Sequence, residues 1–319
     1  MNYFCPDLVK HSTLVNDKLR NEFYKDAIDK SVKDKVVLDM GSGTGLLSFY
    51  ALDAGAKFVY AVEADTTRCI ITQTLLQANF SKDRFKVLNI NFWDYPLNHQ
   101  GIFEHKIDVF LSETVSAAIF CQGAILSWEI FKTIASDDFI SIPDTLSIDV
   151  CEWYGERLFN ENNTSMREQT GISVVSEENT LDPRIHKTLQ AFDKYYFNKF
   201  YTHSRWEDPD DLPEPDKVHE NALVVNVNDN DMSPNFELNF GDTSTRTLGH
   251  ICKLSFGDHT TYLKDWLCDC KYIAIFNVRD CSKVEFKFKN HPYNPSDNKE
   301  TPMGFATNEY QPWAVVTDK

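Results

Sequence analysis

The stretch "VVLDMGSGTGLLSFYALDAGAKFVYAVEAD", from Val36 to Asp65, decides the fold of this chain. It opens with a short apolar run, Val36 to Met40, that stops at a glycine, which is the pattern of a buried strand. Three glycines follow at alternate positions, Gly41, Gly43 and Gly45. Glycine permits positive φ angles and lets a ligand approach the backbone closely. The sequence therefore predicts a strand, a ligand-binding turn and a helix in direct succession.

The residues on either side of this turn alternate between helical and strand patterns. The run "GLLSFYALDAG" predicts a helix that Gly55 closes. Further helices are expected at residues 14–28 and 66–79, and further strands at residues 58–62, 85–89 and 107–111. Such alternation predicts a parallel sheet with helices on both faces. The carboxyl ends of its strands then share one edge, where ligands bind in folds of this kind.

Two carboxylates flank the glycine turn and indicate what it binds. Asp39 lies two residues before Gly41, where an acid repels a pyrophosphate and attracts an ammonium or a sulfonium. Glu63 ends the next strand, 22 residues after Gly41, and its carboxylate can accept hydrogen bonds from both hydroxyls of a ribose. Leu46 stands where a nicotinamide-binding fingerprint has its third glycine, which tells against NAD. This pattern resembles the class I methyltransferases, which bind S-adenosyl-L-methionine; a purely structural turn is the alternative.

The character of the sequence changes after "SIPDT", Ser141 to Thr145. Pro143 is the expected boundary between a first domain, residues 1–143, and a second domain, residues 144–319. In the second domain, short alternating runs predict antiparallel strands of a barrel or sandwich, at residues 146–153, 222–227, 250–256, 272–278 and 284–288. The aromatic-rich segment from Arg184 to Tyr201 has helical spacing and predicts a helical insertion.

Composition limits the partners of the chain. Its 319 residues include 48 acidic and 32 basic side chains, for a net charge of −16. This surplus disfavours direct contact with nucleic acid, whose phosphates need a basic surface. It suits a basic protein partner, although it also serves solubility. Eight scattered cysteines without a CxxC pair predict reduced thiols and no metal site. Without a secretory signal or a long apolar run, we expect a cytoplasmic or nuclear protein with no membrane contact.

Four further segments resemble the protein arginine methyltransferase family. The segment "SETVSAAIFCQG", Ser112 to Gly123, is similar to the double-glutamate loop of that family, nearest its ninth type. The overlapping "GAILSWEIF" is similar to the seventh type. Upstream, "HSTLVNDKLRNEFYKDAI", His11 to Ile28, resembles the family's segment that folds over the cofactor, and "SIPDT" resembles its crossing into a β-barrel. The resemblance covers about residues 8–155 and extends weakly through the second domain.

The resemblance implies a Rossmann-like class I methyltransferase domain followed by a mostly antiparallel β-barrel domain. It also implies methyl transfer from S-adenosyl-L-methionine to arginine in basic protein substrates. Arg20 would make a two-pronged contact with the methionine carboxylate of the donor. The family's adenine-contacting acid aligns with Trp93, which could stack on the adenine while the neighbouring Asp94 accepts from its amino group. Glu113 and Gln122 occupy the positions of the family's two catalytic glutamates, nine residues apart. From the residues alone, Glu113 could equally cap a helix, Arg20 could be a solvated helix residue, and Trp93 could be a core residue.

Two departures from the family's pattern bear on activity. Gln122 keeps the length and one acceptor oxygen of glutamate but loses the charge, and charged hydrogen bonds are about twice as strong as neutral ones. We therefore expect weak or absent arginine methylation, with donor binding retained. Pro312 precedes Trp313 where the family has the histidine of a loop that closes the substrate site.

Three functions remain open at this point. The first is an arginine methyltransferase. The second is a catalytically impaired family member that acts as a regulatory binding subunit, in a homo-oligomer or with a related methyltransferase. The third is a methyltransferase for a different nucleophile, because a fold does not determine its substrate.

Overall fold

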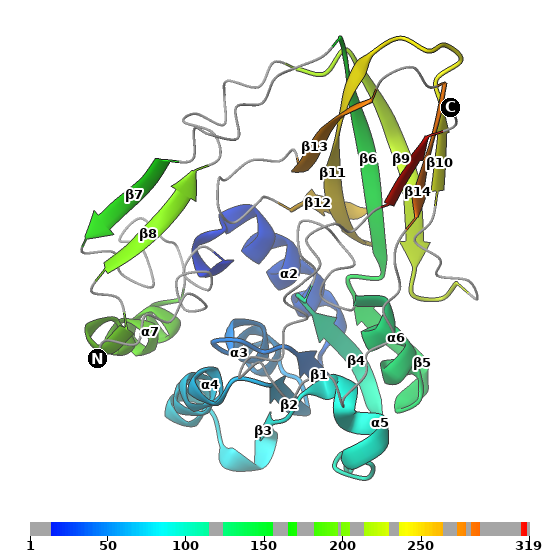
Figure 1. Ribbon diagram of the computed structural model, residues 1–319. Helices are drawn as coiled ribbons and strands as arrows, with labels where there is room; N and C mark the ends of the chain where they lie inside the picture. The colour runs from blue at the N-terminus through cyan, green and yellow to red at the C-terminus, as the bar shows by residue number, and fades with distance from the viewer. Residues whose placement is uncertain are drawn as a thin grey trace.

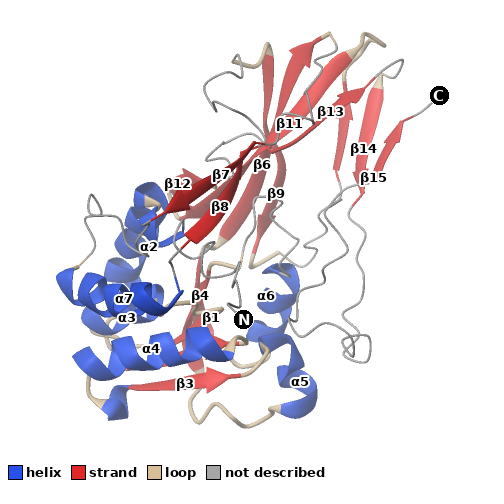
Figure 2. Cartoon of the chain, turned by 60° about the vertical axis from the view of Figure 1, so that its left-hand side comes forward, coloured by secondary structure: helices blue, strands red, loops and turns tan. Residues whose placement is uncertain are grey.

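Figure 1 shows the computed structural model of the chain, which describes residues 14–114, 124–155, 165–170, 182–196, 199–204, 214–229, 236–263, 273–278, 282–287 and 314–317. One part carries a parallel sheet with helices on both sides, and the other carries antiparallel strands (Figures 1 and 2). Three residues singled out from the sequence, Gln122, Pro312 and Trp313, lie outside the described residues.

Five parallel strands form the sheet of the first part, in the order β3-β2-β1-β4-β5. They are β1 Val36–Met40, β2 Phe58–Glu63, β3 Phe85–Asn89, β4 Ile107–Ser112 and β5 Ala135–Ile142. In the central strand β1, Asp39 pairs with Ala61 of β2 and with Leu111 of β4. Every residue of β1 is buried, which explains the unbroken apolar run in the sequence. The predicted α/β fold with a parallel sheet is confirmed.

Helices cover both faces of this sheet. On one face lie α3 Leu46–Asp53 and α4 Thr66–Asn79; on the other lie the 3-10 turn η2 Phe92–Asp94, α5 Tyr95–Asn98 and α6 Ala124–Lys132 (Figures 1 and 2). The first long helix, α2 Lys18–Ser31, packs against α3 and contacts the second part, and the 3-10 turn η1 Lys82–Arg84 precedes β3. Because the chain runs outward from β1 to β3 and then returns to β4 on the other side, the carboxyl ends of β1 and β4 flank a crevice.

Antiparallel strands make up the second part, as predicted. One sheet has the order β12-β11-β6-β9, with β13 also paired to β11; its strands are β6 Thr145–Tyr154, β9 Lys217–Asn226, β11 Arg246–Phe256, β12 His259–Tyr262 and β13 Ile273–Val278. A second sheet joins β10 Phe236–Asn239, β14 Lys283–Lys287 and β15 Ala314–Thr317. A cis peptide bond between Ile142 and Pro143 separates β5 of the parallel sheet from β6 of the antiparallel one.

Three elements of the second part differ in extent from the sequence prediction. Strands β9 and β11 begin at Lys217 and Arg246, earlier than the apolar runs indicate, because pairing with β6 holds their polar first halves. The predicted helix from Arg184 to Tyr201 is shorter in the structure, where α7 spans Pro183–Tyr196. Beyond it, β8 Lys199–Ser204 pairs with β7 Ser165–Thr170. Strand pairing thus overrides the helical spacing at the end of this segment.

Helix α7 docks on the part of the chain that carries the parallel sheet. Its buried Ile185 and Leu189 belong to the hydrophobic core, and the helix packs against α4. Arg184 Nη2 donates to Asp53 Oδ1 at 2.8 Å, and its guanidinium lies 4.8 Å from the ring centroid of Phe49 in α3. Figure 2 shows α7 beside α3 and α4. The insertion therefore ties the two parts of the chain together through the helices behind the glycine turn.

Within the described ranges, no helix is both long and apolar enough to cross a membrane. The same residues contain no group of three or more His, Cys, Asp or Glu side chains placed to hold a metal ion.

Candidate active site

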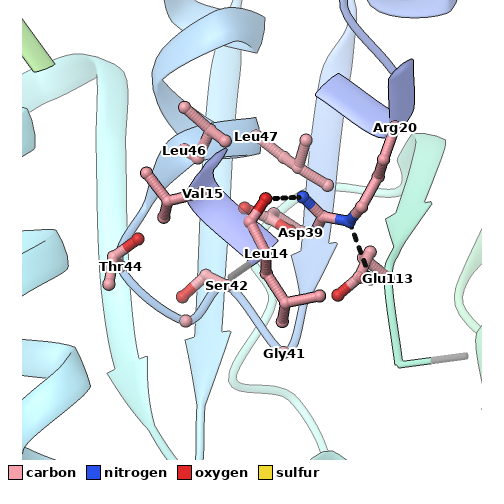
Figure 3. Close-up of a pocket in the computed structure, with 11 residues that line it drawn as sticks. Leu14, Val15, Arg20, Asp39, Gly41, Ser42, Thr44, Leu46, Leu47 and Glu113 are labelled. Carbon is pink, nitrogen blue, oxygen red and sulfur yellow. Dashed lines mark hydrogen bonds and ion pairs between the residues drawn. The ribbon is translucent and has the colours of Figure 1, made fainter. Parts of the chain in front are cut away.

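A small cavity lies between the glycine turn and the start of α2, at the carboxyl ends of β1 and β4 (Figure 3). Its walls are Leu14, Val15, Arg20, Asp39, Gly41, Ser42, Gly43, Thr44, Leu46, Leu47 and Glu113. The volume of this cavity is about 30 Å³. Figure 3 shows Leu14 and Val15 projecting across the glycine turn.

The glycine turn has the backbone that its composition predicts. The φ angles of Gly41, Gly43 and Gly45 are +73°, +56° and +87°. A Cβ atom on Gly41 would lie 2.5 Å from Cγ2 of Thr114, so side chains larger than hydrogen are excluded. Gly45 is the N-cap residue of α3. The turn therefore brings the backbone at the end of β1 directly against the segment that follows β4.

Asp39 is a buried acid whose side chain is held by Ser48 of α3. The residue is 1% exposed, and the Ser48 hydroxyl donates to its Oδ2 at 2.6 Å. Burial raises the pKa of Asp39 from 3.8 to about 7, against a smaller lowering by the Ser48 hydrogen bonds. A cation placed in the cavity would favour the ionised form. Asp39 is thus an acid that a positively charged ligand would stabilise.

Arg20 and Glu113 form an ion pair that joins α2 to the end of β4. Arg20 Nε donates to Glu113 Oε1 at 2.8 Å, and the side chains are 6% and 13% exposed. The Nη1 atom donates to the Leu14 carbonyl at 3.0 Å and to Asn21 Oδ1 at 2.8 Å. Burial lowers the pKa of Arg20, but the Glu113 carboxylate raises it, and the net shift is upward. Among the described residues, neither Nη2 of Arg20 nor Oε2 of Glu113 makes a hydrogen bond, so each retains capacity for a ligand.

Tyr24 is a site residue that sequence reasoning missed. It is fully buried, its hydroxyl donates to the Ser112 carbonyl at 2.8 Å, and Arg20 lies 5.6 Å from its ring centroid. Burial, and then the charge of Glu113, raise its pKa, so the hydroxyl remains a donor. It holds the end of β4 immediately before Glu113. The sequence feature that could have identified Tyr24 is its position four residues after Arg20, which places both residues on the same face of α2.

Glu63 sits behind the glycine turn and is already hydrogen-bonded. Its Oε2 accepts from Gly43 N at 2.9 Å; its Oε1 accepts from Asp65 N at 2.8 Å and from Arg68 Nη2 at 2.9 Å. A carboxylate oxygen has two lone pairs. Oε2 therefore has room for one further donor, whereas Oε1 does not. This buried acid is held by three hydrogen bonds, and no sequence pattern indicated that Arg68 is its ion-pair partner.

The remaining predicted residues lie outside this cavity. Trp93 is part of η2, is partly buried against the hydrophobic core, and its Nε1 donates to Ser127 Oγ of α6 at 3.0 Å. Asp94 ends the same turn. Neither residue lines the cavity. The structure thus brings together Arg20, Asp39, the glycines and Glu113, and it places Glu63 against the turn. It leaves Trp93 and Asp94 in η2, which packs against α6.

The chemistry of the lining fits a zwitterionic, cationic ligand such as S-adenosyl-L-methionine. The hydroxyl oxygen of Ser42 is buried and has no hydrogen-bond partner in the described part of the chain, which is costly unless a ligand supplies one. Arg20 Nη2 suits a carboxylate, and Asp39 suits an ammonium or a sulfonium. The residues present therefore fit the cofactor that the sequence predicts.

Known proteins that are similar to this chain include several methyltransferases. Residues 25–121 match the family described as Ribosomal protein L11 methyltransferase (PrmA). The chain is 33% identical to Protein arginine N-methyltransferase 9 of Xenopus laevis over 117 residues, which is 36% of this chain and 14% of that protein. It is 29% identical to Protein arginine N-methyltransferase 7 of Rattus norvegicus over 171 residues, 51% of this chain and 25% of that protein. Both matches span a quarter or less of the relative's length.

Two solved structures share the fold over most of the chain. The crystal structure of PRMT6 has a TM-score of 0.57 at 16% sequence identity and covers 91% of this chain and 97% of its own. The Trypanosoma brucei PRMT1 enzyme-prozyme complex has a TM-score of 0.52 at 16% identity and covers 86% of both chains. The parallel sheet and glycine turn followed by an antiparallel domain define a class I methyltransferase fold of two parts. By sequence, the chain is similar to protein arginine N-methyltransferases over about a third to a half of its length.

Proposed function

We propose that this chain binds S-adenosyl-L-methionine in the cavity beside the glycine turn. The observation that carries the proposal is that Arg20, Asp39, the glycines and Glu113 line one space at the carboxyl edge of the sheet. Arg20 Nη2 would hold the methionine carboxylate, and Asp39 would face the positive charge. Glu63 Oε2 would accept one ribose hydroxyl, with Trp93 and Asp94 near the adenine. When bound, this cofactor supplies an electrophilic methyl group on a sulfonium.

We further propose that the acceptor is an arginine guanidinium of a basic protein. Arginine is a poor nucleophile because its charge is delocalised and its pKa exceeds about 12. A site must therefore orient the guanidinium and draw positive charge away from the attacking nitrogen. Glu113 Oε2 is available for this task at the end of β4. Arg20 already shares the same carboxylate, so a single glutamate serves two cations, and loss of the second glutamate at Gln122 leaves the site short of one negative charge.

Calorimetric titration with S-adenosyl-L-methionine tests donor binding. The variant Arg20→Ala should weaken binding by roughly 10- to 100-fold, because a charged hydrogen bond contributes about 1.5–3 kcal/mol. The control is Lys25→Ala, which removes a positive charge from the exposed face of the same helix and should leave the affinity within twofold. No binding by the wild-type protein, or equal losses in the two variants, would refute the assignment of this cavity.

The second candidate function is a regulatory subunit with impaired catalysis. Gln122 favours this function because it lacks the charge of glutamate. The Trypanosoma brucei neighbour, which has the same fold, belongs to an enzyme-prozyme heterotetrameric complex. The variant Gln122→Glu separates the two functions in an assay with labelled donor and arginine-rich peptides. If the wild-type site lacks only this one negative charge, Gln122→Glu should raise the turnover roughly 100-fold, which is the effect on rate of one preorganised electrostatic contact. No gain on any peptide, with donor binding intact, would favour the regulatory role or a different nucleophile.

The acidic charge of the chain supports a basic, arginine-containing protein as substrate or partner and disfavours nucleic acid. We also propose a cytoplasmic or nuclear location, and an assembly as a homo-oligomer or with a related methyltransferase subunit. Size-exclusion chromatography with light scattering tests the first form of assembly, and co-purification with tagged methyltransferases from the same cell tests the second.

A further inference from the structure

We propose that Thr72 of α4 is a positioning residue for the methyl donor, because its hydroxyl holds the glycine turn in the shape that receives the ligand. The identity of the ligand rests on the proposed function. The contact itself is a property of the ligand-free protein, and it can be tested separately.

The peptide groups of Gly43 are held from two sides. Thr72 Oγ1 donates to the Gly43 carbonyl at 2.8 Å, and the Gly43 N–H donates to Glu63 Oε2 at 2.9 Å. Thr72 is fully buried. Gly43 has a positive φ of +56°, so its backbone lies outside helix and strand geometry and depends on side chains for its orientation. Two side chains from different elements therefore fix the middle of the turn.

Thr72 also sets the space at the end of the turn. A Cβ atom on Gly45 would lie 3.1–3.2 Å from the Cγ2, Cα and Oγ1 atoms of Thr72. These distances are shorter than ordinary van der Waals contact, so Thr72 leaves little room for a side chain at position 45. The same residue thus hydrogen-bonds to Gly43 and favours glycine at position 45.

The direction of the Thr72 hydroxyl is unusual for a threonine inside a helix. Such a hydroxyl commonly bonds back to the carbonyl four residues earlier. Thr74, two residues further along α4, does this: its Oγ1 donates to the Ile70 carbonyl at 2.7 Å. Thr72 instead donates across to a different segment, 29 residues away in sequence. Its hydroxyl therefore serves the turn and not the helix.

Arg68 supports the same arrangement from one helical turn earlier. It lies four residues before Thr72, on the same face of α4, and its Nη2 donates to Glu63 Oε1 at 2.9 Å. Glu63 in turn accepts from the Gly43 N–H. Helix α4 therefore braces the turn twice, directly through Thr72 and indirectly through Arg68 and Glu63.

The test compares three variants of the full chain. Thr72→Val keeps the shape and removes the hydroxyl, Thr72→Ser keeps the hydroxyl and removes the methyl group, and Thr74→Val is the control on the same helix. Hydrogen exchange of the peptide that covers the glycine turn is measured without ligand, with a β3 peptide as internal reference. Calorimetry then gives the dissociation constant for S-adenosyl-L-methionine, and steady-state assays give KM and kcat wherever turnover is measurable.

The valine variant at position 72 should raise exchange in the turn, and not in β3, by about three- to tenfold, which is the range expected for loss of one hydrogen bond. Its dissociation constant, and its KM for the donor, should rise by a similar factor with kcat changed less than twofold. Thr72→Ser and Thr74→Val should both stay within twofold of the wild type.

Unchanged exchange in Thr72→Val overturns the proposal, and so does an equal loss in Thr72→Ser, because the methyl group would then be responsible. A rise in exchange of equal size in the turn and in β3 also overturns it, since that result reports general destabilisation. If the wild-type protein binds no S-adenosyl-L-methionine, the proposed function fails, while the exchange comparison still decides whether the hydroxyl holds the turn.

Discussion

Replacing Asp39 with asparagine should stabilise the ligand-free protein at alkaline pH, although it removes a residue of the candidate site. Asp39 is 1% exposed, and burial raises its pKa to about 7 from an ordinary value of 3.8. Asparagine has the same shape, keeps an acceptor for the Ser48 hydroxyl and carries no charge. The variant therefore removes the cost of a buried negative charge while it leaves the packing in place.

The size and sign of the effect follow from the two pKa values. Because the pKa is higher in the folded protein, the folded state holds a proton that the unfolded chain has lost between about pH 4 and pH 7. The stability contributed by this proton is complete below about pH 4, and it is lost as the pH rises to about 7. A difference of roughly three pKa units corresponds to about 4 kcal/mol, of which about 2–3 kcal/mol falls between pH 5 and pH 8.

Urea unfolding of the ligand-free proteins at pH 5 and pH 8, followed by tryptophan fluorescence, measures this difference. The free energy of unfolding of Asp39→Asn, relative to wild type, should be about 2–3 kcal/mol higher at pH 8 than at pH 5. Asp29→Asn, on the exposed face of α2, is the control and should differ from wild type by less than about 0.5 kcal/mol at both values. A relative stability of Asp39→Asn that is the same at both pH values, or lower at pH 8, would refute the reasoning.

Two further predictions concern the same turn. Binding of S-adenosyl-L-methionine to the wild-type protein should release up to one proton near pH 7, because a cationic ligand favours the ionised form of Asp39. Calorimetry in buffers of different ionisation enthalpy measures this proton release. If Asp39→Asn released the same number of protons, Asp39 would not be their source. Gly41→Ala should lower the free energy of unfolding by about 1–3 kcal/mol or more, because its Cβ atom would meet Thr114 at 2.5 Å and its φ is +73°. Gly101→Ala, with a φ of +82° and nothing within 4 Å, is the control for the backbone cost alone, and equal losses in the two alanine variants would show that the contact with Thr114 does not matter.

The sequence was enough to predict four of the five strands of the parallel sheet; β5 Ala135–Ile142 was not predicted. Strands at residues 36–40 and 85–89 and the helix at residues 66–79 have the bounds that the sequence patterns predicted, and the structure adds that Asp65 is the N-cap of this helix. These signals are local: a buried parallel strand needs a continuous apolar run, and a helix needs a cap at its first turn. The alternating glycines and their positive φ angles are local in the same sense, since the conformation depends on the missing side chain.

What only the tertiary structure decided is which distant groups share one site. Arg20 and Glu113 are 93 residues apart, and the sequence indicated a ligand partner for each without showing that they bind one another. Thr72 and Gly43 meet because the chain crosses from β1 over α3 to β2 and returns along α4. Local patterns determine helices and strands through backbone geometry and burial, but a contact between side chains depends on strand order and on the packing of whole helices, which no short window of sequence contains.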